Sequence, residues 1–411
     1  MNGTTPTPLG QRALRSLNFF MADMQAGVGP FLGVFLLAHG WQSGWIGSVM
    51  TIGGVAGVLM TAPAGAWVDS SHHKRWLVAV CGLFTVFASA VMLLSQSFWP
   101  VAISQVATAV AGAAIGPAVA GITLGMFRQS GFNHHNGINQ AYNHAGNAVG
   151  AGLSGLLGWK FGLPAVFLLA VAFAIASIVS VFSIPPGSID DRVARGLSSD
   201  DRTPERARGL SILLHCKPLL VLAACLALFH LGNAAMLPLY GLAVVGAKES
   251  SPAPFVAATI VVAQTTMVLT AVVAMHMSER RGLWLVLLIS FASLPVRGLI
   301  AACVIKTWGV FPVQILDGVG AGLQSVAVPA LVARILNGTG RVNVGQGAVM
   351  TAQGVGASVS PAIGGWLAQW HGYAPAFLIL GAFALGSVAI WCLCWSGLRS
   401  ACATSGTLAA N

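Results

Sequence analysis

Long apolar runs alternate with short polar segments along the whole chain. A helix needs about 20 predominantly apolar residues to cross a bilayer. Twelve runs meet this requirement, at about 14–38, 44–67, 76–95, 99–126, 137–158, 163–184, 218–243, 252–276, 283–305, 308–334, 345–369 and 373–396. The two-residue alternation of a barrel strand is nowhere sustained. The pattern therefore predicts an all-α integral membrane protein with twelve transmembrane helices.

The longest polar stretch divides these runs into six before it and six after it. It extends from Pro185 to Ser211 and carries acidic and basic side chains together. We expect it to be a solvated linker. The predicted organisation is an N-terminal six-helix bundle at 1–184, a cytoplasmic linker at 185–211 and a C-terminal six-helix bundle at 212–411.

The distribution of Lys and Arg fixes the expected orientation. With twelve spans, 16 of the 20 basic residues fall on one side of the membrane, and only Lys160, Lys248 and Lys306 fall on the other. Basic loop residues collect in the cytoplasm. The sequence predicts a multi-pass protein of the cell inner (plasma) membrane, with both termini and the linker cytoplasmic.

Composition agrees with a membrane protein and narrows the class. Charged residues make up 7% of the 411, against about 25% in soluble proteins. The net charge of +10 belongs to the cytoplasmic loops, so nucleic acid is not an expected partner. The phosphate-binding pattern G-x-x-x-x-G-K-[ST] is absent, which excludes ATP-driven transport by this chain. No clustered nucleophile or metal set indicates an enzyme, and no cofactor is expected.

The two halves carry an internal repeat. A shift of 210 residues pairs glycines of the fourth to sixth spans with glycines of the tenth to twelfth, as in Gly112/Gly322 and Gly146/Gly356. The same shift pairs Asp23 with Asn233. Because six helices separate the copies, both halves enter the membrane in the same direction. This arrangement predicts a pseudo-two-fold axis along the membrane normal, with a cavity between the halves.

The loop after the second span carries a recognisable motif, Gly65-Ala-Trp-Val-Asp69-Ser-Ser-His-His-Lys74-Arg75. Together with the six-plus-six pattern it resembles the major facilitator superfamily. Ser278-Glu279-Arg280-Arg281 is similar to a weaker second copy. The resemblance implies that Gly65, Asp69, Lys74, Arg75, Glu279 and Arg280 bias conformational exchange, in a secondary transporter that works by alternating access.

The subfamily and direction of transport stay open at this point. Gln105 stands where drug/proton antiporters of the superfamily usually carry an Arg, and their fifth-span Gly-Pro is absent. Family frequency favours a proton-coupled antiporter that carries out efflux of a small organic solute. The alternatives are uptake of an organic anion or metal chelate, a transporter-like sensor, or a polytopic enzyme. The expected partners are the solute, protons and the lipid bilayer, and we expect a monomer.

Ionisable groups at membrane depth are costly and indicate function. Asp23 and Asp317 are the two carboxylates expected inside the membrane, and we assign them to proton coupling, with packing as the alternative. His230 titrates near neutrality and lies three residues before Asn233, on the same helix face. His230 is a third candidate for proton coupling or a packing residue, and Asn233 is a candidate substrate contact.

A polar stripe follows the fifth span. Its members are Asn139, Gln140, Asn143, His144 and Asn147. Unpaired amides in lipid are costly, so the stripe must face inward, toward substrate or a neighbouring helix. The eleventh span contributes Gln353 as a further candidate substrate contact.

Arg297 follows Pro295 inside the ninth span. At 1.5 Å per residue, its depth differs from that of Asp317 by only about 5 Å. An ion pair between them would neutralise both charges, and snorkelling to the headgroups is the alternative. The loop pairs His72/His73 and His134/His135 lack acidic or Cys partners, so we expect solvated loops and no metal site.

Overall fold

The fold was analysed in a computed structural model, which describes residues 7–26, 28–190, 193–195, 216–336 and 342–402. The described residues form helices and no strand. The α-helices are α1 (Pro8–Ala26), α2 (Val28–Ala38), α3 (Ser43–Ser70), α4 (Lys74–Leu94), α5 (Phe98–Phe161), α6 (Pro164–Phe182), α8 (Lys217–Asn233), α9 (Met236–Gly246), α10 (Pro252–Arg281), α11 (Leu283–Cys303), α12 (Val310–Ile335), α13 (Val342–His371), α14 (Tyr373–Leu393) and α15 (Trp395–Cys402). Short 3₁₀ turns lie at Pro186–Ser188, Val193–Arg195 and Thr307–Gly309.

Every predicted span coincides with helix, which confirms the all-helical membrane fold. Within the described residues, nine helices are long and apolar enough to cross a membrane. One predicted span, 218–243, is broken into α8 and α9. The break was not predicted, although Pro238 lies five residues after the last residue of α8. Proline has no amide hydrogen and clashes with the carbonyl four residues earlier.

The break between α8 and α9 is stabilised from a neighbouring helix. The amide of Ala235 donates a 2.9 Å hydrogen bond to Ser360 Oγ of α13. A backbone amide left open at membrane depth needs such a partner. Asn233 thus lies at the end of α8, directly before the break.

The predicted fourth and fifth spans both lie within α5. The helical backbone is interrupted between them at Arg128, with φ 55° and ψ 178°. The polar residues after Arg128 are helical, whereas the sequence predicted a connecting loop at 127–136. Polar residues therefore continue the helix here, because most of a helix's stability in a protein comes from tertiary packing and not from its own sequence.

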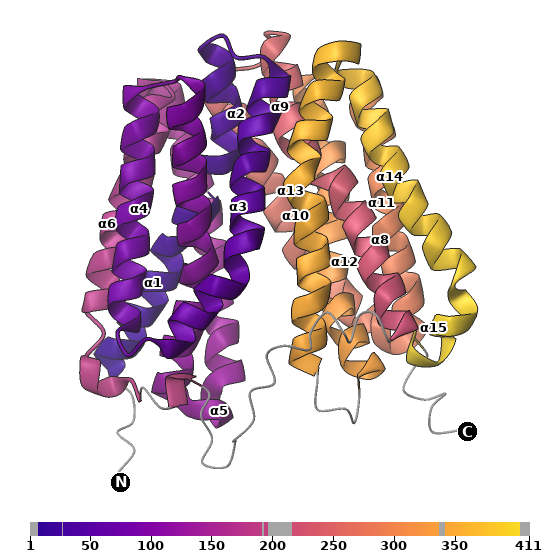
Figure 1. The fold of residues 1–411 in the computed structure, drawn as a ribbon. Helices are drawn as coiled ribbons and strands as arrows, with labels where there is room; N and C mark the ends of the chain where they lie inside the picture. The colour runs from indigo at the N-terminus through magenta and orange to yellow at the C-terminus, as the bar shows by residue number, and fades with distance from the viewer. Residues whose placement is uncertain (1–6, 27, 191–192, 196–215, 337–341, 403–411) are drawn as a thin grey trace. The chain divides into compact units, whose positions relative to one another are not determined.

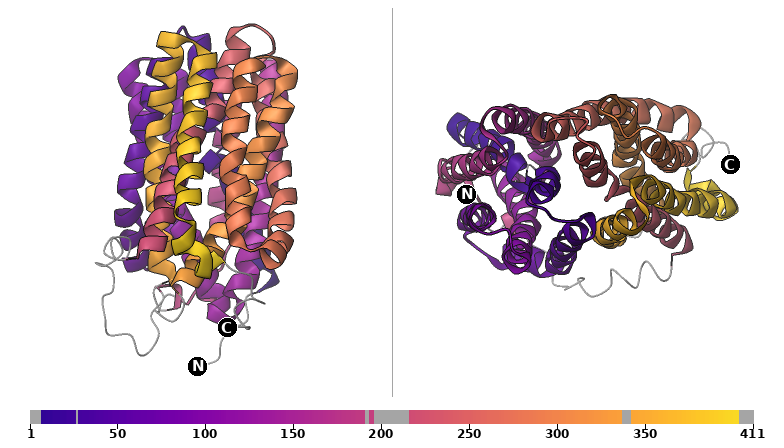
Figure 2. Two further views of the ribbon diagram at one scale, coloured as in Figure 1. Left: turned by 90° about the vertical axis from the view of Figure 1, so that its right-hand side faces the viewer. Right: turned by 90° about the horizontal axis from the view of Figure 1, so that it is seen from above.

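The described chain forms two compact units. The first comprises residues 1–39, 52–203 and 251–257, and the second comprises residues 40–51, 204–250 and 258–411. In the first unit α5 packs against α1 and α4, and α6 packs against α1 and α4. In the second unit α8 packs against α13 and α14, while α11 packs against α12 and α14. The helices within each unit run roughly parallel, as the side and top views show (Figure 1, Figure 2).

Small residues allow the helices to approach closely. In the first unit Ala111, Ala114 and Ala118 of α5 are almost fully buried beside Leu14 and Leu17 of α1. In membranes helix association depends on close van der Waals packing, which small side chains permit. In the second unit Thr270 of α10 donates a 2.9 Å hydrogen bond to the carbonyl of Gly318 in α12. This tight packing positions the polar groups described next.

A candidate polar site in the second unit

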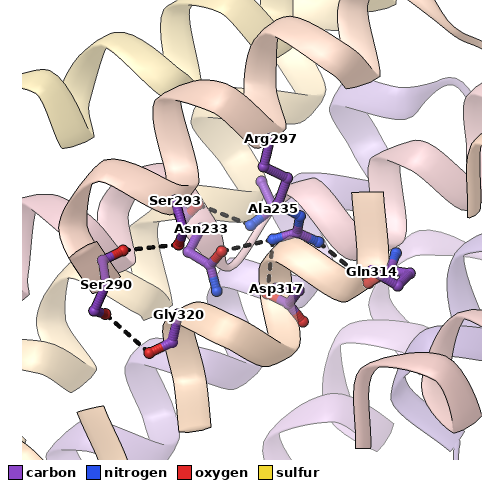
Figure 3. A network of polar contacts seen from close by, with 9 residues as sticks. Asn233, Ala235, Ser290, Ser293, Arg297, Gln314, Asp317 and Gly320 are labelled. Atoms are coloured by element: carbon purple, nitrogen blue, oxygen red, sulfur yellow. Dashed lines mark hydrogen bonds and ion pairs between the residues drawn. The ribbon is translucent and has the colours of Figure 1, made fainter. Parts of the chain in front are cut away.

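Arg297 is the centre of a polar network inside the second unit. It lies on α11 and its exposed fraction is 0%. Nη1 donates to Asn233 Oδ1 at 2.6 Å and to Asp317 Oδ1 at 2.7 Å, and Nη2 contacts Gln314 Oε1 at 3.4 Å. Figure 3 shows the guanidinium surrounded by these three acceptors. Of the two alternatives that the sequence left open for Arg297, the structure shows the ion pair with Asp317 and not snorkelling.

The partners of Arg297 come from two other helices, α8 and α12. Asn233 ends α8, while Gln314 and Asp317 are one turn apart on α12. A buried charge keeps its place only when paired and hydrogen-bonded. The Asp317 side chain is less enclosed than its partner, at 16% exposure against 1% for Arg297. The pair thus has one buried member and one partly exposed member.

A second polar chain begins at His230, one turn before Asn233. His230 Nε2 lies 3.2 Å from Gln324 Oε1 and 2.6 Å from the side-chain amide of Gln353. Gln324 Nε2 donates to Ser290 Oγ at 2.9 Å, and Ser290 donates to the carbonyl of Gly320 at 2.9 Å. Four helices, α8, α11, α12 and α13, therefore meet through one hydrogen-bonded chain (its Ser290–Gly320 end is drawn in Figure 3).

Part of this site was predicted from the sequence. The structure brings five predicted residues into the two adjoining networks, namely His230, Asn233, Arg297, Asp317 and Gln353. The connecting residues Gln314, Gln324, Ser290 and Ser360 were not predicted. Gln314 and Gln324 lie three before and seven after Asp317, so a search along that one face of α12 would have found them.

The polar stripe of the fifth span makes contacts inside the first unit. Asn139 Nδ2 donates to Thr123 Oγ1 at 2.9 Å. Asn143 Nδ2 contacts the carbonyl of Asn18 in α1 at 3.4 Å, and Asn147 Nδ2 contacts Asn143 Oδ1 at 3.3 Å. The sequence left two roles open for this stripe, namely contact with substrate and bonding to a neighbouring helix. The contacts of Asn139 and Asn143 support bonding to a neighbouring helix.

Two stripe residues differ from these amides. Gln140 is exposed. The Nδ1 atom of His144 is buried and has no hydrogen-bond partner in the described part of the chain. Neither residue contributes to the interhelical contacts of Asn139 and Asn143, so the stripe does not act as one structural unit.

The loop motif holds helix ends together within the first unit. Arg75 donates from Nε to the Val181 carbonyl at 3.2 Å and from Nη2 to the Phe182 carbonyl at 2.8 Å. Its guanidinium also lies 5.4 Å from the centroid of the Phe182 ring. Carbonyls at the end of a helix lack intrahelical donors. Arg75 therefore caps α6 as a cation at its negative end.

Lys74 of the same motif is only 2% exposed. Its Nζ donates to the Ser71 carbonyl at 2.9 Å. Its methylene chain crosses α5 at Gly121, where an added Cβ would lie 2.7 Å from Lys74 Cε. The lack of a side chain at Gly121 thus leaves room for this path of the lysine, a relationship the sequence alone did not indicate.

The remaining motif residues have fewer described contacts. Gly65 lies in α3 with open space around its α-carbon. Glu279 and Arg280 are exposed at the end of α10. Asp69 lies in α3 and Asp23 in α1, and the side chains of both lie outside the described part of the structure.

No group of three His, Cys, Asp or Glu side chains able to hold a metal occurs among the described residues. Loop histidines His72 and His73 are exposed. His135 stacks on Phe127 at 3.5 Å between ring centroids. The side chain of His134 lies outside the described part.

Comparison with known proteins identifies the family. A family profile described as Major Facilitator Superfamily matches residues 16–311. The chain belongs to the major facilitator superfamily. It is 36% identical over 389 residues to two uncharacterized MFS-type transporters of Mycobacterium tuberculosis, strains CDC 1551 / Oshkosh and H37Rv, and the match covers 93% of each chain. The resemblance inferred from the sequence is confirmed.

Solved structures of other transporters share the fold. The nucleoside transporter NupG matches with a TM-score of 0.76 at 15% identity, covering 94% of this chain and 99% of NupG. The peptide transporter POT in complex with sulfate matches with 0.76 at 14% identity, covering 98% and 97%. A bacterial homolog of the human lysosomal transporter Spinster matches with 0.67 at 14% identity, covering 97% and 98%. This superfamily member is thus a multi-pass membrane transporter and not an enzyme.

Proposed function

We propose that this transporter exports a small organic solute by alternating access and couples the export to protons. One observation carries the coupling: the carboxylate of Asp317 is partly exposed, while its cationic partner Arg297 is fully buried. Ionisable groups at membrane depth are retained for function. The exposed member of the pair is the acid that a proton can reach.

Protonation of Asp317 would change the balance of charge around Arg297. The guanidinium would keep only two neutral acceptors, Asn233 Oδ1 and Gln314 Oε1. An uncompensated buried cation is strongly destabilising. A proton on Asp317 would therefore favour a rearrangement of α8, α11 and α12, which supply these groups. This link between protonation and helix position is what proton coupling requires.

Asp23 is the second proposed proton carrier. It lies on α1 and is the repeat mate of Asn233. Arg15, at the cytoplasmic end of the first span, is the one Lys or Arg within the first six predicted spans, and the interior of these spans offers Asp23 no cation. We place His230 third, as a group that adjusts affinity or the pH optimum, because its Nε2 is engaged with Gln324 and Gln353.

The proposed substrate contacts lie in both units. In the second they are Asn233 and Gln353, beside His230. In the first they are the stripe residues Asn139, Gln140, Asn143, His144 and Asn147. Gln140 and His144 are the stronger candidates of the stripe, because Asn139 and Asn143 are already bonded across helices.

The alternative of organic-anion or chelate uptake finds less support in the described site. Arg297 is the one cation of the described network, and Asp317 neutralises it. We further propose an inner-membrane location with both termini cytoplasmic, based on the 16-of-20 basic bias. Gly65, Asp69, Lys74, Arg75, Glu279 and Arg280 remain the proposed conformational motif.

Mass-spectrometric profiling of solutes exported from expressing cells tests this function. We expect one or more compounds to leave the cells against their gradient and to stop doing so when a protonophore collapses the proton gradient. Asp317→Asn should abolish this uphill export while exchange down the solute's own gradient persists. Protonophore-resistant uphill export would reject proton coupling, and net accumulation inside cells would reject the direction.

A further inference from the structure

One face of α12 connects the two polar networks. Asp317, Ala321 and Gln324 are spaced i, i+4, i+7 and so lie along one side of the helix. Asp317 and Ala321 are partly exposed, whereas Gln324 is buried against His230. We use the name α12 face for these three residues of α12 together with two residues of α8, His230 and Asn233. It is a polar surface with an open side at Asp317 and Ala321.

Charge is distributed unevenly between the depth and the surface of this face. The positive charge of Arg297 is at 0% exposure, with its Nη atoms directed at three acceptors. The negative charge of Asp317 is on a side chain with 16% exposure. The pair is neutral overall, yet a solute at the open side approaches the carboxylate first. In a low-dielectric surrounding this ordering has a large effect on charged solutes.

Hydrogen bonding around His230 adds a second acceptor. Ser290 donates to the Gly320 carbonyl, so its oxygen must accept from Gln324 Nε2. This fixes the Gln324 amide with its oxygen toward His230 Nε2, which must then carry the imidazole proton. This assignment requires the Gln353 amide to be turned by 180°, so that its oxygen takes the place of the Nε2 atom that lies 2.6 Å from His230 Nε2; the two ends of an amide are interchangeable in assignment. The lone pair of a neutral His230 is therefore on Nδ1.

Two acceptors of the α12 face are left open. Among the described residues, nothing hydrogen-bonds the second carboxylate oxygen of Asp317 or Nδ1 of His230. The side-chain oxygen of Asn233 already accepts a hydrogen bond from Arg297, so only its amide hydrogens remain available to a solute. The free groups are thus one anionic acceptor, one neutral acceptor and one weak donor.

We propose that the α12 face binds a non-anionic solute that presents O–H or N–H donors, such as an amine or a polyhydroxylated compound. The proposal rests on the transport function above and names the class of its substrate. A donor group on the solute would bond Asp317, and a second would bond His230 Nδ1. Carboxylates and phosphates would be repelled, because the cation that could attract them is enclosed.

Cysteine labelling with reagents of opposite charge tests this without knowledge of the substrate. Ala321→Cys places a thiol one turn from Asp317 without removing a hydrogen bond. Cys216, Cys303, Cys392 and Cys394 are replaced by Ser in the full chain, while the buried Cys81, Cys225 and Cys402 stay. The purified protein in detergent is treated with the trimethylammonium-ethyl or the sulfonato-ethyl methanethiosulfonate, and labelling is followed by intact mass.

The rate of each reagent is first divided by its rate with a free thiol in solution. After this correction, we expect the cationic reagent to label the Ala321→Cys thiol about tenfold faster than the anionic reagent. Asp317→Asn in the same background should remove the preference. Because that variant leaves Arg297 unpaired and could misfold, the double variant Arg297→Gln/Asp317→Asn provides the same comparison with both charges absent. Ser325→Cys places the thiol about 12 Å from Asp317 along the axis of α12. This variant should show little preference between the two reagents at 0.1 M salt.

Equal or faster reaction of the anionic reagent would overturn the proposal. So would a Cys at 321 that reacts with neither reagent, because a closed face cannot hold a solute. Labelling does not depend on transport, so the two proposals fail separately. A cationic preference without any solute export would reject the proposed function and leave the site, whereas export of an anion with no cationic preference would reject the site and leave transport.

Discussion

Arg297 and Asp317 are 20 residues apart on neighbouring helices, and their side chains meet at 2.7 Å inside the second unit. Asn233 and Gln314 complete the acceptors around the guanidinium. The arrangement ties α8, α11 and α12 together through one buried cation. It makes the second unit sensitive to any change in the charge of Asp317.

The first prediction concerns the coupling between these two charges. Arg297→Gln and Asp317→Asn should each lower the free energy of unfolding, the latter by roughly 3–5 kcal/mol because it leaves a buried charge unpaired. The double variant should be more stable than Asp317→Asn alone. Thermal unfolding of all four forms in detergent gives the double-mutant cycle. Strictly additive effects would contradict a direct pair.

A second prediction follows from the capping of α6 by Arg75. Arg75→Lys replaces the donors Nε and Nη2, which the planar guanidinium holds in a fixed fork, by a single flexible ammonium group that fits the Val181 and Phe182 carbonyls less well. Arg75→Lys should therefore cost roughly 1–3 kcal/mol of stability, in the range of charged hydrogen bonds. Thermal unfolding measures it, and Arg280→Lys at the exposed end of α10 is the matched control. Equal stability of Arg75→Lys and wild type would argue against the cap.

The third prediction concerns Asp23. Asp23→Asn should abolish proton-driven movement of the exported solute while exchange down its own gradient continues, because Asn cannot carry a proton. The measurement is solute flux in proteoliposomes with and without an imposed pH gradient. His230→Gln should change affinity or the pH optimum less severely. Uphill transport by Asp23→Asn would leave Asp317 or His230 as the carrier.

A fourth prediction tests orientation. Cysteines introduced at Thr5 and Thr407 should be unreactive to a membrane-impermeant maleimide in intact cells and reactive after permeabilisation, because the basic loops place both ends in the cytoplasm. A cysteine at Lys306, on the opposite side by the basic count, serves as the accessible control. Labelling of either terminus from outside would overturn the orientation.

The candidate site shows which of its residues can be predicted from the sequence and which cannot. Arg297 and Asp317 were recognisable because charges are rare at membrane depth, and helix rise placed them at similar depths. The choice between pairing and snorkelling depends on which way each helix is turned, and packing decides that. Gln314, Gln324 and Ser290 carry no such signal, since uncharged polar residues are common in membrane helices.

The sequence by itself determined the class and the family of this transporter. Hydrophobic run length is set by bilayer thickness, so it can be read locally. Tertiary structure alone decided that the seventh span breaks before Pro238, where Ser360 bonds the free amide of Ala235. It alone decided that Lys74 is buried over Gly121 and that Arg297 faces Asn233, Asp317 and Gln314. These contacts join residues far apart in the chain, and their geometry exists only once the helices have packed.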